Sequence, residues 1–323
     1  MSILVQGLAL LFPGQGSQEV GMGQDLFESC PEARQVFAEA DQILGFPISQ
    51  LCFEGPKEVL DDTINTQPAI FTTSLAVLRA IEASDSLPRP AVVAGHSMGE
   101  LTALVAAGAL DMADGLRLVR ERGRLMKLAG ERNPGGMAAI LRMDDTQVEQ
   151  ACREASAETG RPVQVANYNS PGQIVISGDR QALARVIELL QEQGGRRIVP
   201  LAVSIAAHSP LMASVAEEYR AAIEATPLRD PVVPVIANIS ARPLADAGEI
   251  RAELAGQLTW PVRWTASIQA MIAQGVTHFV EVGPKDVLSG LVKRIDPNVE
   301  AISISDTTGI RSSECTLPTK SQL

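Results

Sequence analysis

The chain has 323 residues, of which 46% are hydrophobic and 20% charged, and this composition excludes an intrinsically disordered protein. The 27 Lys and Arg residues against 38 Asp and Glu residues give a net charge of −11. Because so acidic a chain repels phosphate groups and anionic lipid, we expect neither nucleic acid nor a membrane among its partners. The length allows one large domain with an insertion, or two domains.

The cysteines predict neither a metal site nor a disulfide framework. They are Cys30, Cys52, Cys152 and Cys315, without a Cys-x-x-Cys pair or a neighbouring histidine. The N-terminus has no basic segment, and its apolar stretch ends at Pro13-Gly14, so we expect no signal peptide and no membrane-spanning helix. We therefore expect a protein of the reducing cytoplasm.

Short apolar runs alternate with longer helical patterns along most of the chain. The runs Leu8–Phe12, Ala91–Gly95 and Phe279–Val282 predict buried strands, and the stretches Ile70–Ala83, Gly99–Ala107 and Ala113–Ala129 predict helices. Such alternation is typical of an α/β protein, in which helices cover a mostly parallel sheet.

The segment 135–201 has a different order of predicted elements. It consists of a strand (Met137–Leu141), a helix (Thr146–Thr159), two strands (Val163–Asn167 and Gln173–Ser177), a helix (Arg180–Gln193) and a strand (Arg197–Leu201). This β-α-β-β-α-β order is ferredoxin-like. We therefore predict a small subdomain over 135–201, inserted into a large subdomain of residues 1–134 and 202–305. Residues 306–323 are polar and aperiodic and predict a loose tail.

A Gly-x-Ser-x-Gly motif with Ser97 at its centre lies between a predicted strand and a predicted helix. In the nucleophile elbow, the serine occupies a strained turn and the glycines on both sides remove side chains that would clash. The following helix N-terminus supplies N–H groups to developing negative charge. The alternative is a plain Gly/Ser loop, but the correct flanks favour Ser97 as a catalytic nucleophile.

A nucleophilic serine needs a base, and the chain has three histidines. His96 adjoins Ser97, where its side chain should point away from that of its neighbour, and His278 opens an apolar strand. His208 lies where the chain returns from the inserted subdomain, and pockets form at such junctions. We therefore favour His208 over His278 as the base. No motif places an aspartate beside it, so a backbone carbonyl is the alternative partner of the imidazole.

Arg122 falls on the apolar stripe of its predicted helix, opposite the other basic residues of that helix. A buried arginine needs an anionic partner. A structural salt bridge and a bidentate contact to a substrate carboxylate are equally compatible with this position.

The segment Phe12–Gln18 is a glycine-rich turn after the first strand. It lacks the lysine of a P-loop, so nucleotide binding is weakly supported. A backbone N–H of this turn, together with that of Met98, suits an oxyanion hole better.

Five motifs in a fixed order carry a resemblance to a known family. They are Phe12–Gln18 (FPGQGSQ), Gly95–Glu100 (GHSMGE), Val119–Gly123 (VRERG), Ala166–Pro171 (ANYNSP) and Glu281–Pro284 (EVGP). From about Leu8 to Ile304, the chain resembles malonyl-CoA:acyl carrier protein transacylases and the acyltransferase domains of fatty acid and polyketide synthases. The resemblance implies an α/β-hydrolase-like large subdomain with an inserted ferredoxin-like small subdomain.

The resemblance also assigns roles to individual residues. It implies that Ser97 is the acyl-accepting nucleophile, that His208 is the general base, and that Arg122 pairs with the malonyl carboxylate. The other implied positions are the oxyanion-hole amides of Gln15 and Met98, the histidine-orienting carbonyl of Gln257, and the pocket-lining residues Gln67 and Asn167. Two departures stand out: Met98 replaces the usual leucine, and Ala207 replaces the usual phenylalanine of malonyl-selective members. The smaller side chain at Ala207 puts strict malonyl selectivity in doubt.

The expected reaction is a ping-pong transfer of malonyl from malonyl-CoA to the phosphopantetheine thiol of acyl carrier protein, through an ester on Ser97. We expect no bound cofactor or metal, and a monomer. Alternatives are a free-standing polyketide acyltransferase that uses a branched malonyl-CoA, an acyl-thioester hydrolase or carboxylesterase, which gains nothing from Arg122, and a non-catalytic docking scaffold for the carrier protein. Because carrier proteins are typically acidic, docking should use a local basic patch, with Arg196, Arg197, Lys285 and Lys293 as candidates.

Overall fold

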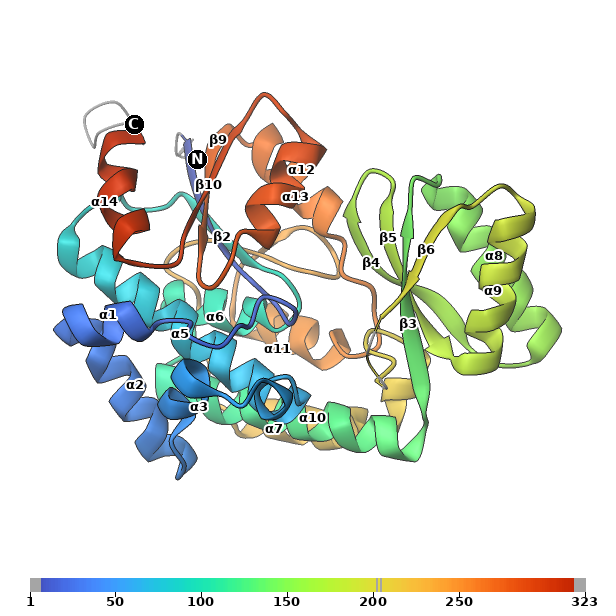
Figure 1. The fold of residues 1–323 in the computed structure, drawn as a ribbon, viewed down its shortest axis with the longest axis horizontal. Coiled ribbons are helices and arrows are strands. Elements are labelled where there is room, and N and C mark those ends of the chain that lie inside the picture. The colour runs from blue at the N-terminus through green and yellow to red at the C-terminus, as the bar shows by residue number, and fades with distance from the viewer. Residues whose placement is uncertain (1–6, 202, 204, 317–323) are drawn as a thin grey trace.

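The computed structural model describes residues 7–201, 203 and 205–316, which form two subdomains, each built on one sheet (Figure 1). The described part of the large subdomain has a six-stranded sheet in the order β10-β9-β1-β2-β7-β8. Its strands are β1 (Gly7–Phe12), β2 (Val92–Gly95), β7 (Val235–Ile236), β8 (Pro243–Leu244), β9 (Val276–Val282) and β10 (Glu300–Ile304). All neighbours pair in parallel except β7 and β8.

Helices cover both faces of this sheet. They are α1 (Gln24–Ser29), α2 (Pro31–Leu44), α3 (Ile48–Glu54), α4 (Lys57–Leu60), α5 (Thr63–Ser84), α6 (Gly99–Ala106), α7 (Met112–Arg132), the 3₁₀ helix η1 (Pro210–Val215), α10 (Ala216–Ala225), α11 (Ala247–Gly256), α12 (Trp264–Ala273), α13 (Val287–Ile295) and α14 (Thr307–Thr316). Alternate residues of β1 enter two different apolar cores: Leu8 and Leu10 pack on one face and Ala9 and Leu11 on the other. This burial on both faces explains why β1 is apolar without interruption.

The register of β1 and β2 brings two of the motifs together. Phe12 lies opposite Gly95, and the His96 N–H donates to the Phe12 carbonyl at 3.0 Å. The turn after β1 and the turn after β2 therefore emerge side by side at the carboxyl edge of the sheet, where open α/β sheets bind their ligands.

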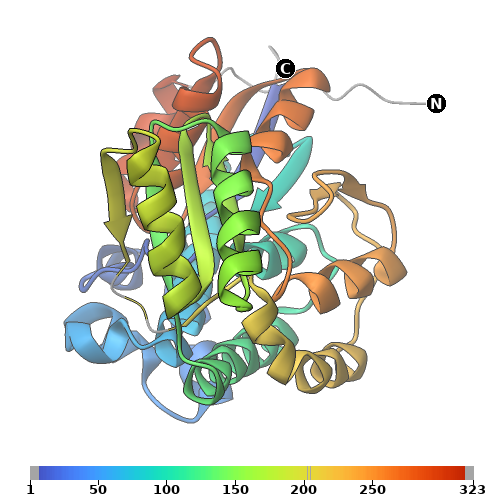
Figure 2. The same cartoon turned by 90° about the vertical axis from the view of Figure 1, so that its right-hand side faces the viewer.

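The small subdomain is a four-stranded antiparallel sheet in the order β4-β5-β3-β6, in the described residues, with two helices. Its elements are β3 (Gly135–Leu141), α8 (Asp145–Thr159), β4 (Val163–Ser170), β5 (Gln173–Asp179), α9 (Arg180–Glu192) and β6 (Arg197–Pro200). The predicted β-α-β-β-α-β order is confirmed. Figures 1 and 2 show α8 and α9 on the side of the sheet that faces away from the large subdomain.

Main-chain hydrogen bonds join the edge strand β4 to the large subdomain. The Tyr168 N–H donates to the Val262 carbonyl at 2.9 Å, and the Val262 N–H donates to the Ala166 carbonyl at 2.8 Å. The free face of the small sheet is thereby held over the carboxyl edge of the large one.

The loose tail that we expected from residue 306 is wrong for its first part, because residues 307–316 form α14. The Gly309 N–H donates to the Asp306 carboxylate at 2.7 Å, and Ile310 is buried against the large core. A capping aspartate and the buried Ile310 thus stabilise a helix that the Ser/Thr-rich composition conceals. Residues 317–323 lie outside the described part. None of the described helices combines the length and the hydropathy that a membrane crossing requires.

Candidate active site

Ser97 lies in a strained turn between β2 and α6. Its φ is 53°, in the left-handed region that non-glycine residues seldom adopt. A Cβ on Gly95 would approach the Gly99 carbonyl oxygen to 1.9 Å, and a Cβ on Gly99 would approach the Phe12 carbonyl oxygen to 2.2 Å. The two glycines are therefore required by close approach of the main chain, as the motif predicts.

Asn238, which the sequence analysis missed, holds this turn. Its Oδ1 accepts from the Ser97 N–H at 2.8 Å, and its Nδ2 donates to the Gly95 carbonyl at 2.8 Å. Asn238 is 2% exposed and lies just after β7. One amide side chain thus satisfies two main-chain groups of the strained turn, which a regular element would otherwise satisfy.

His208 lies beside Ser97, at the return from the small subdomain. Its Nε2 is 2.8 Å from Ser97 Oγ, and its Nδ1 is 2.8 Å from the Gln257 carbonyl oxygen and 3.2 Å from that of Trp260. Because both partners of Nδ1 are acceptors, Nδ1 carries the proton of a neutral imidazole. Nε2 is then free to accept the proton of the Ser97 hydroxyl.

The surroundings of His208 keep the imidazole neutral. Burial, followed by the nearby Arg122 charge and His96, lowers the pKa of His208 from 6.5 to about 3. The carbonyl groups of Gln257 and Trp260 act in the opposite direction. A histidine in this state is a base rather than a standing cation at neutral pH.

Arg122 is 1% exposed, and its guanidinium is held by uncharged acceptors. Its Nε donates to Gln257 Oε1 at 3.0 Å and one terminal nitrogen donates to Gln67 Oε1 at 2.9 Å. The other terminal nitrogen donates to Ser97 Oγ at 3.1 Å. Arg122 therefore points from the apolar face of α7 at the candidate nucleophile.

No carboxylate pairs with Arg122, and none of the ion pairs between described residues includes it. Burial lowers the pKa of Arg122, yet a guanidinium stays protonated in proteins. Tyr219 and the Glu100 charge oppose this lowering of the pKa, but no carboxylate of the described residues contacts the guanidinium. A buried cation without a contacting anion is costly to maintain. This arrangement favours the second of the two interpretations, in which an anion brought by the substrate completes the pairing.

A cavity of about 250 Å³ contains Ser97, His208 and Arg122 between the two subdomains. Its other lining residues are Gln15, Thr63, His96, Met126, Met137, Asn167, Asn169, Val175, Leu201, Val203, Ile205 and Ala207. Asn167 and Ala207 thus line the cavity, as we expected. Gln67 does not line the cavity, contrary to our expectation, because it is fully buried in α5. Its side chain contacts the Arg122 guanidinium and Met126 instead.

Two main-chain N–H groups close to Ser97 have no hydrogen-bond acceptor in the described part of the chain. Among the described residues, neither the Gln15 N–H nor the Met98 N–H donates a hydrogen bond. Gln15 follows β1 and Met98 precedes α6, so the register of β1 and β2 brings the two groups to the same edge of the sheet. The motif predicts the Met98 N–H as an oxyanion donor and the resemblance implies the Gln15 N–H, and both assignments stay predictions.

The other two histidines have structural partners. His96 Nε2 is 2.8 Å from Asn169 Oδ1, and its ring meets Trp264 edge-on at 5.4 Å. His278 lies in β9, with its Nδ1 2.8 Å from Thr277 Oγ1. His208 is therefore the histidine whose ring nitrogen contacts Ser97.

The predicted basic patch is only partly connected to the cavity. Lys285 Nζ donates to the Gly16 carbonyl at 3.3 Å, beside Gln15. Arg196 and Arg197 are exposed at the start of β6, and Lys293 is exposed in α13.

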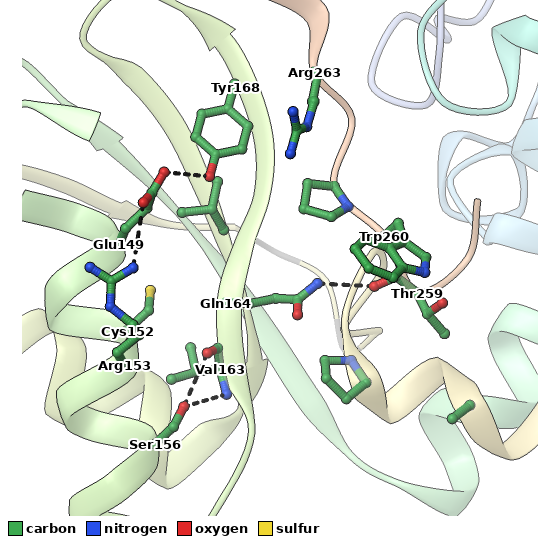
Figure 3. Close-up of a pocket in the computed structure, with 14 residues that line it drawn as sticks. Glu149, Cys152, Arg153, Ser156, Val163, Gln164, Tyr168, Thr259, Trp260 and Arg263 are labelled. Atoms are coloured by element: carbon green, nitrogen blue, oxygen red, sulfur yellow. Dashed lines mark hydrogen bonds and ion pairs between the residues drawn. The ribbon is translucent and has the colours of Figure 1, made fainter. Parts of the chain in front are cut away.

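A second cavity, of about 840 Å³, is lined by residues of both subdomains and is drawn in Figure 3. Gln164 crosses it from β4, and its Nε2 donates to the Thr259 carbonyl at 2.9 Å and to the His208 carbonyl at 2.8 Å. Burial raises the pKa of the Cys152 thiol in its wall to about 12, so this thiol is not a nucleophile. Gln164 therefore supports the His208 loop from this side.

Metal chemistry finds no support in the described residues, which contain no cluster of three His, Cys, Asp or Glu side chains able to hold an ion. Cys30, Cys52 and Cys152 are free thiols. The Cys315 side chain lies outside the described part.

Ser97 lies in a left-handed turn of an α/β domain and is hydrogen-bonded to the neutral His208. This arrangement is typical of enzymes that carry an acyl group on serine. The chain belongs to the acyl transferase domain family, whose model matches residues 9–307.

Individual relatives cover nearly the whole chain. The malonyl CoA-acyl carrier protein transacylase of Bacillus subtilis is 46% identical over 299 residues, 93% of each protein. The solved structure of such a transacylase from Xanthomonas oryzae has a TM-score of 0.93 and 42% identity, over 98% of this chain and 99% of that one. A malonyl-transacylase solved in complex with its type II PKS acyl-carrier protein has a TM-score of 0.93 and 38% identity, over 97% of this chain and 100% of that one. The predicted family and fold class are confirmed.

Proposed function

We propose that this chain transfers malonyl groups from malonyl-CoA to the phosphopantetheine thiol of acyl carrier protein, for fatty acid or polyketide synthesis. The observation that carries the proposal is Arg122, a buried guanidinium that no carboxylate of the described residues contacts and that donates to Ser97 Oγ at 3.1 Å. An acyl group with a free carboxylate supplies the missing anion, and the relatives' printed substrate is such an acyl group. We also place the protein in the cytoplasm, consistent with its free thiols.

In the first half-reaction, Ser97 Oγ attacks the thioester carbonyl carbon and its proton moves to His208 Nε2. The oxyanion accepts hydrogen bonds from the N–H groups of Gln15 and Met98. When the tetrahedral intermediate collapses, the C–S bond breaks, and His208 returns the proton to the CoA sulfur. The second half-reaction runs in reverse, with the carrier-protein thiol as the attacking group.

The carboxylate of the bound acyl group takes the place that Ser97 Oγ now occupies on Arg122. Gln257 and Gln67 accept from two of the three guanidinium nitrogens of Arg122. These contacts hold the guanidinium in place, with its remaining nitrogen directed at Ser97 and the cavity. The Gln257 main-chain carbonyl meanwhile orients His208.

Wild-type protein mixed with malonyl-CoA should gain one malonyl mass on the Ser97 peptide, and added holo carrier protein should remove it. The measurement is mass spectrometry of the peptide, with free malonate quantified in parallel. Faster release of free malonate than transfer to carrier protein would instead identify a thioesterase, and absence of the mass gain would exclude both enzymes.

Ala207→Phe should reduce the use of methylmalonyl-CoA about tenfold while malonyl-CoA is affected less. Ala207 is half-buried, lines the cavity and precedes His208, so a larger side chain removes the room for a methyl branch. Competition between the two CoA esters measures the effect. Ala213→Phe, in the second cavity, is the matched control. Unchanged use of methylmalonyl-CoA would show that Ala207 does not set the extender unit.

The acylation rate should stay level as the pH is lowered through 6.5. Protonated His208 cannot accept the Ser97 proton, but burial holds the pKa of His208 at about 3, so the loss begins only well below 6.5. Since the Arg122 charge contributes to this lowering, Arg122→Ala should move the acidic limb of the profile to higher pH. Rapid-quench measurement of kcat/KM against pH tests both. A wild-type limb centred near 6.5 would contradict the expectation.

A further inference from the structure

Glu100, in the first turn of α6, is a buried carboxyl group that the mechanism above does not use. It is fully buried, three residues after Ser97. One carboxylate oxygen accepts from the Asn238 N–H at 2.9 Å, and the other accepts from Gln257 Nε2. No ion pair between described residues includes Glu100, although its charge opposes the effect of burial on the pKa of Arg122. Burial and the Glu253 charge raise the pKa of Glu100 itself well above its usual range, and the hydrogen bonds from Asn238 and Gln257 act in the opposite direction. Its two oxygens therefore connect segments that both reach the site.

Through Gln257, Glu100 determines which atom Arg122 meets. Gln257 Nε2 donates to Glu100 and, at 3.1 Å, to the Ser97 carbonyl, so Gln257 Oε1 is left to face Arg122 Nε at 3.0 Å. With the amide turned the other way, an N–H donor would face the guanidinium. The acceptor on Glu100 thus fixes the orientation in which Gln257 holds Arg122.

Through Asn238, Glu100 also anchors the turn of the nucleophile. The Asn238 main chain bonds to Glu100, and its side chain bonds to the Ser97 N–H and the Gly95 carbonyl. The Glu100 carboxylate therefore holds both Asn238, which fixes the serine turn, and Gln257, which contacts Arg122.

We propose that Glu100 is a positioning residue for substrate selection: by fixing the Gln257 amide, it aims Arg122 at the substrate carboxylate. The proposal rests on the proposed malonyl transfer, and it assigns a role to a residue that contacts neither the substrate nor the reacting atoms. Its consequence is specific. Loss of this hold weakens the preference for malonyl over acetyl, rather than acylation in general.

Glu100→Gln tests this with a nearly isosteric change. The introduced amide keeps its oxygen on the fixed Asn238 N–H and turns its NH₂ toward Gln257 Nε2, so two donors face each other. Since a side chain moves more readily than the main chain, Gln257 is displaced and Arg122 loses its fixed acceptor. We expect the ratio of kcat/KM for malonyl-CoA to that for acetyl-CoA to fall about tenfold, with acetyl-CoA acylation within about threefold of wild type.

Glu253→Gln is the matched control. Glu253 is also buried and close to Glu100, but its carboxylate accepts from the Ile239 N–H at 2.7 Å and does not contact the Gln257 side chain. We expect this variant to keep the wild-type substrate ratio.

Gln257→Met removes the amide and keeps the carbonyl that orients His208, so it should lower the substrate ratio as Glu100→Gln does. The double variant should lose no more than either single variant, because both act through one contact. An equal fall for both substrates in Glu100→Gln, or additive losses in the double variant, would overturn the proposal. If Glu100→Gln does not fold, an unchanged ratio in Gln257→Met overturns it. Wild-type protein that forms no malonyl ester would instead refute the proposed function.

Discussion

Ser97→Ala should abolish the acyl-enzyme, and His208→Ala should slow its formation on the order of 10⁴-fold. Without Oγ no ester can form. His208 Nε2 lies 2.8 Å from Ser97 Oγ, so without this nitrogen the proton of the Ser97 hydroxyl has no acceptor. Rapid-quench mass spectrometry of the Ser97 peptide with malonyl-CoA measures both effects.

His278→Ala is the matched control for the base. His278 lies in β9, and its removal should leave the acylation rate within about twofold of wild type, because its partners Thr277 and Glu300 are not among the cavity residues. An unchanged mass gain in Ser97→Ala would exclude Ser97 as the nucleophile. If His278→Ala lowers the acylation rate strongly and His208→Ala lowers it little, His278 rather than His208 is the base.

The parts of the site that could be predicted are those that depend on local sequence. The turn at Ser97 follows from two glycines between a strand and a helix, and the burial of Arg122 follows from the periodicity of α7. The order of elements in the small subdomain is likewise local. The Met98 amide follows from the same motif. The assignments of Gln15 and Gln257 came from the resemblance, since no local pattern distinguishes either residue. The boundaries at 134/135 and 201/202 stay a prediction.

The contacts that could not be predicted join residues far apart in the chain. Asn238 bonds to Ser97 across 141 positions, and Gln257 bonds to Glu100 across 157. Neither residue lies in a pattern that distinguishes it from other polar residues at the end of a strand or helix. Their roles follow from the packing of β7 and α11 against the serine turn, which only the assembled fold determines.

Arg122→Ala should remove most of the preference for malonyl-CoA over acetyl-CoA. In the wild type, an acetyl group leaves the buried guanidinium without an anion, whereas malonyl pairs with it. A charged hydrogen-bonding group left unpaired costs about 1–3 kcal/mol, which corresponds to a change in the substrate ratio of about 5–150-fold. The measurement is the ratio of kcat/KM for Ser97 acylation by the two CoA esters.

Arg124→Ala provides the control on the same helix, because Arg124 is exposed and paired with Glu121 at 2.7 Å. This variant should leave the substrate ratio unchanged, because a solvent-exposed ion pair contributes little and does not contact the bound acyl group. Arg122→Lys should fall between wild type and Arg122→Ala: an ammonium keeps the charge but cannot reproduce the fork that Gln257 and Gln67 hold in place. If Arg122→Ala keeps the wild-type preference for malonyl-CoA, another group must bind the malonyl carboxylate. Since Arg122 is the buried cation among the groups lining the described cavity, that result would contradict the proposed basis of selectivity.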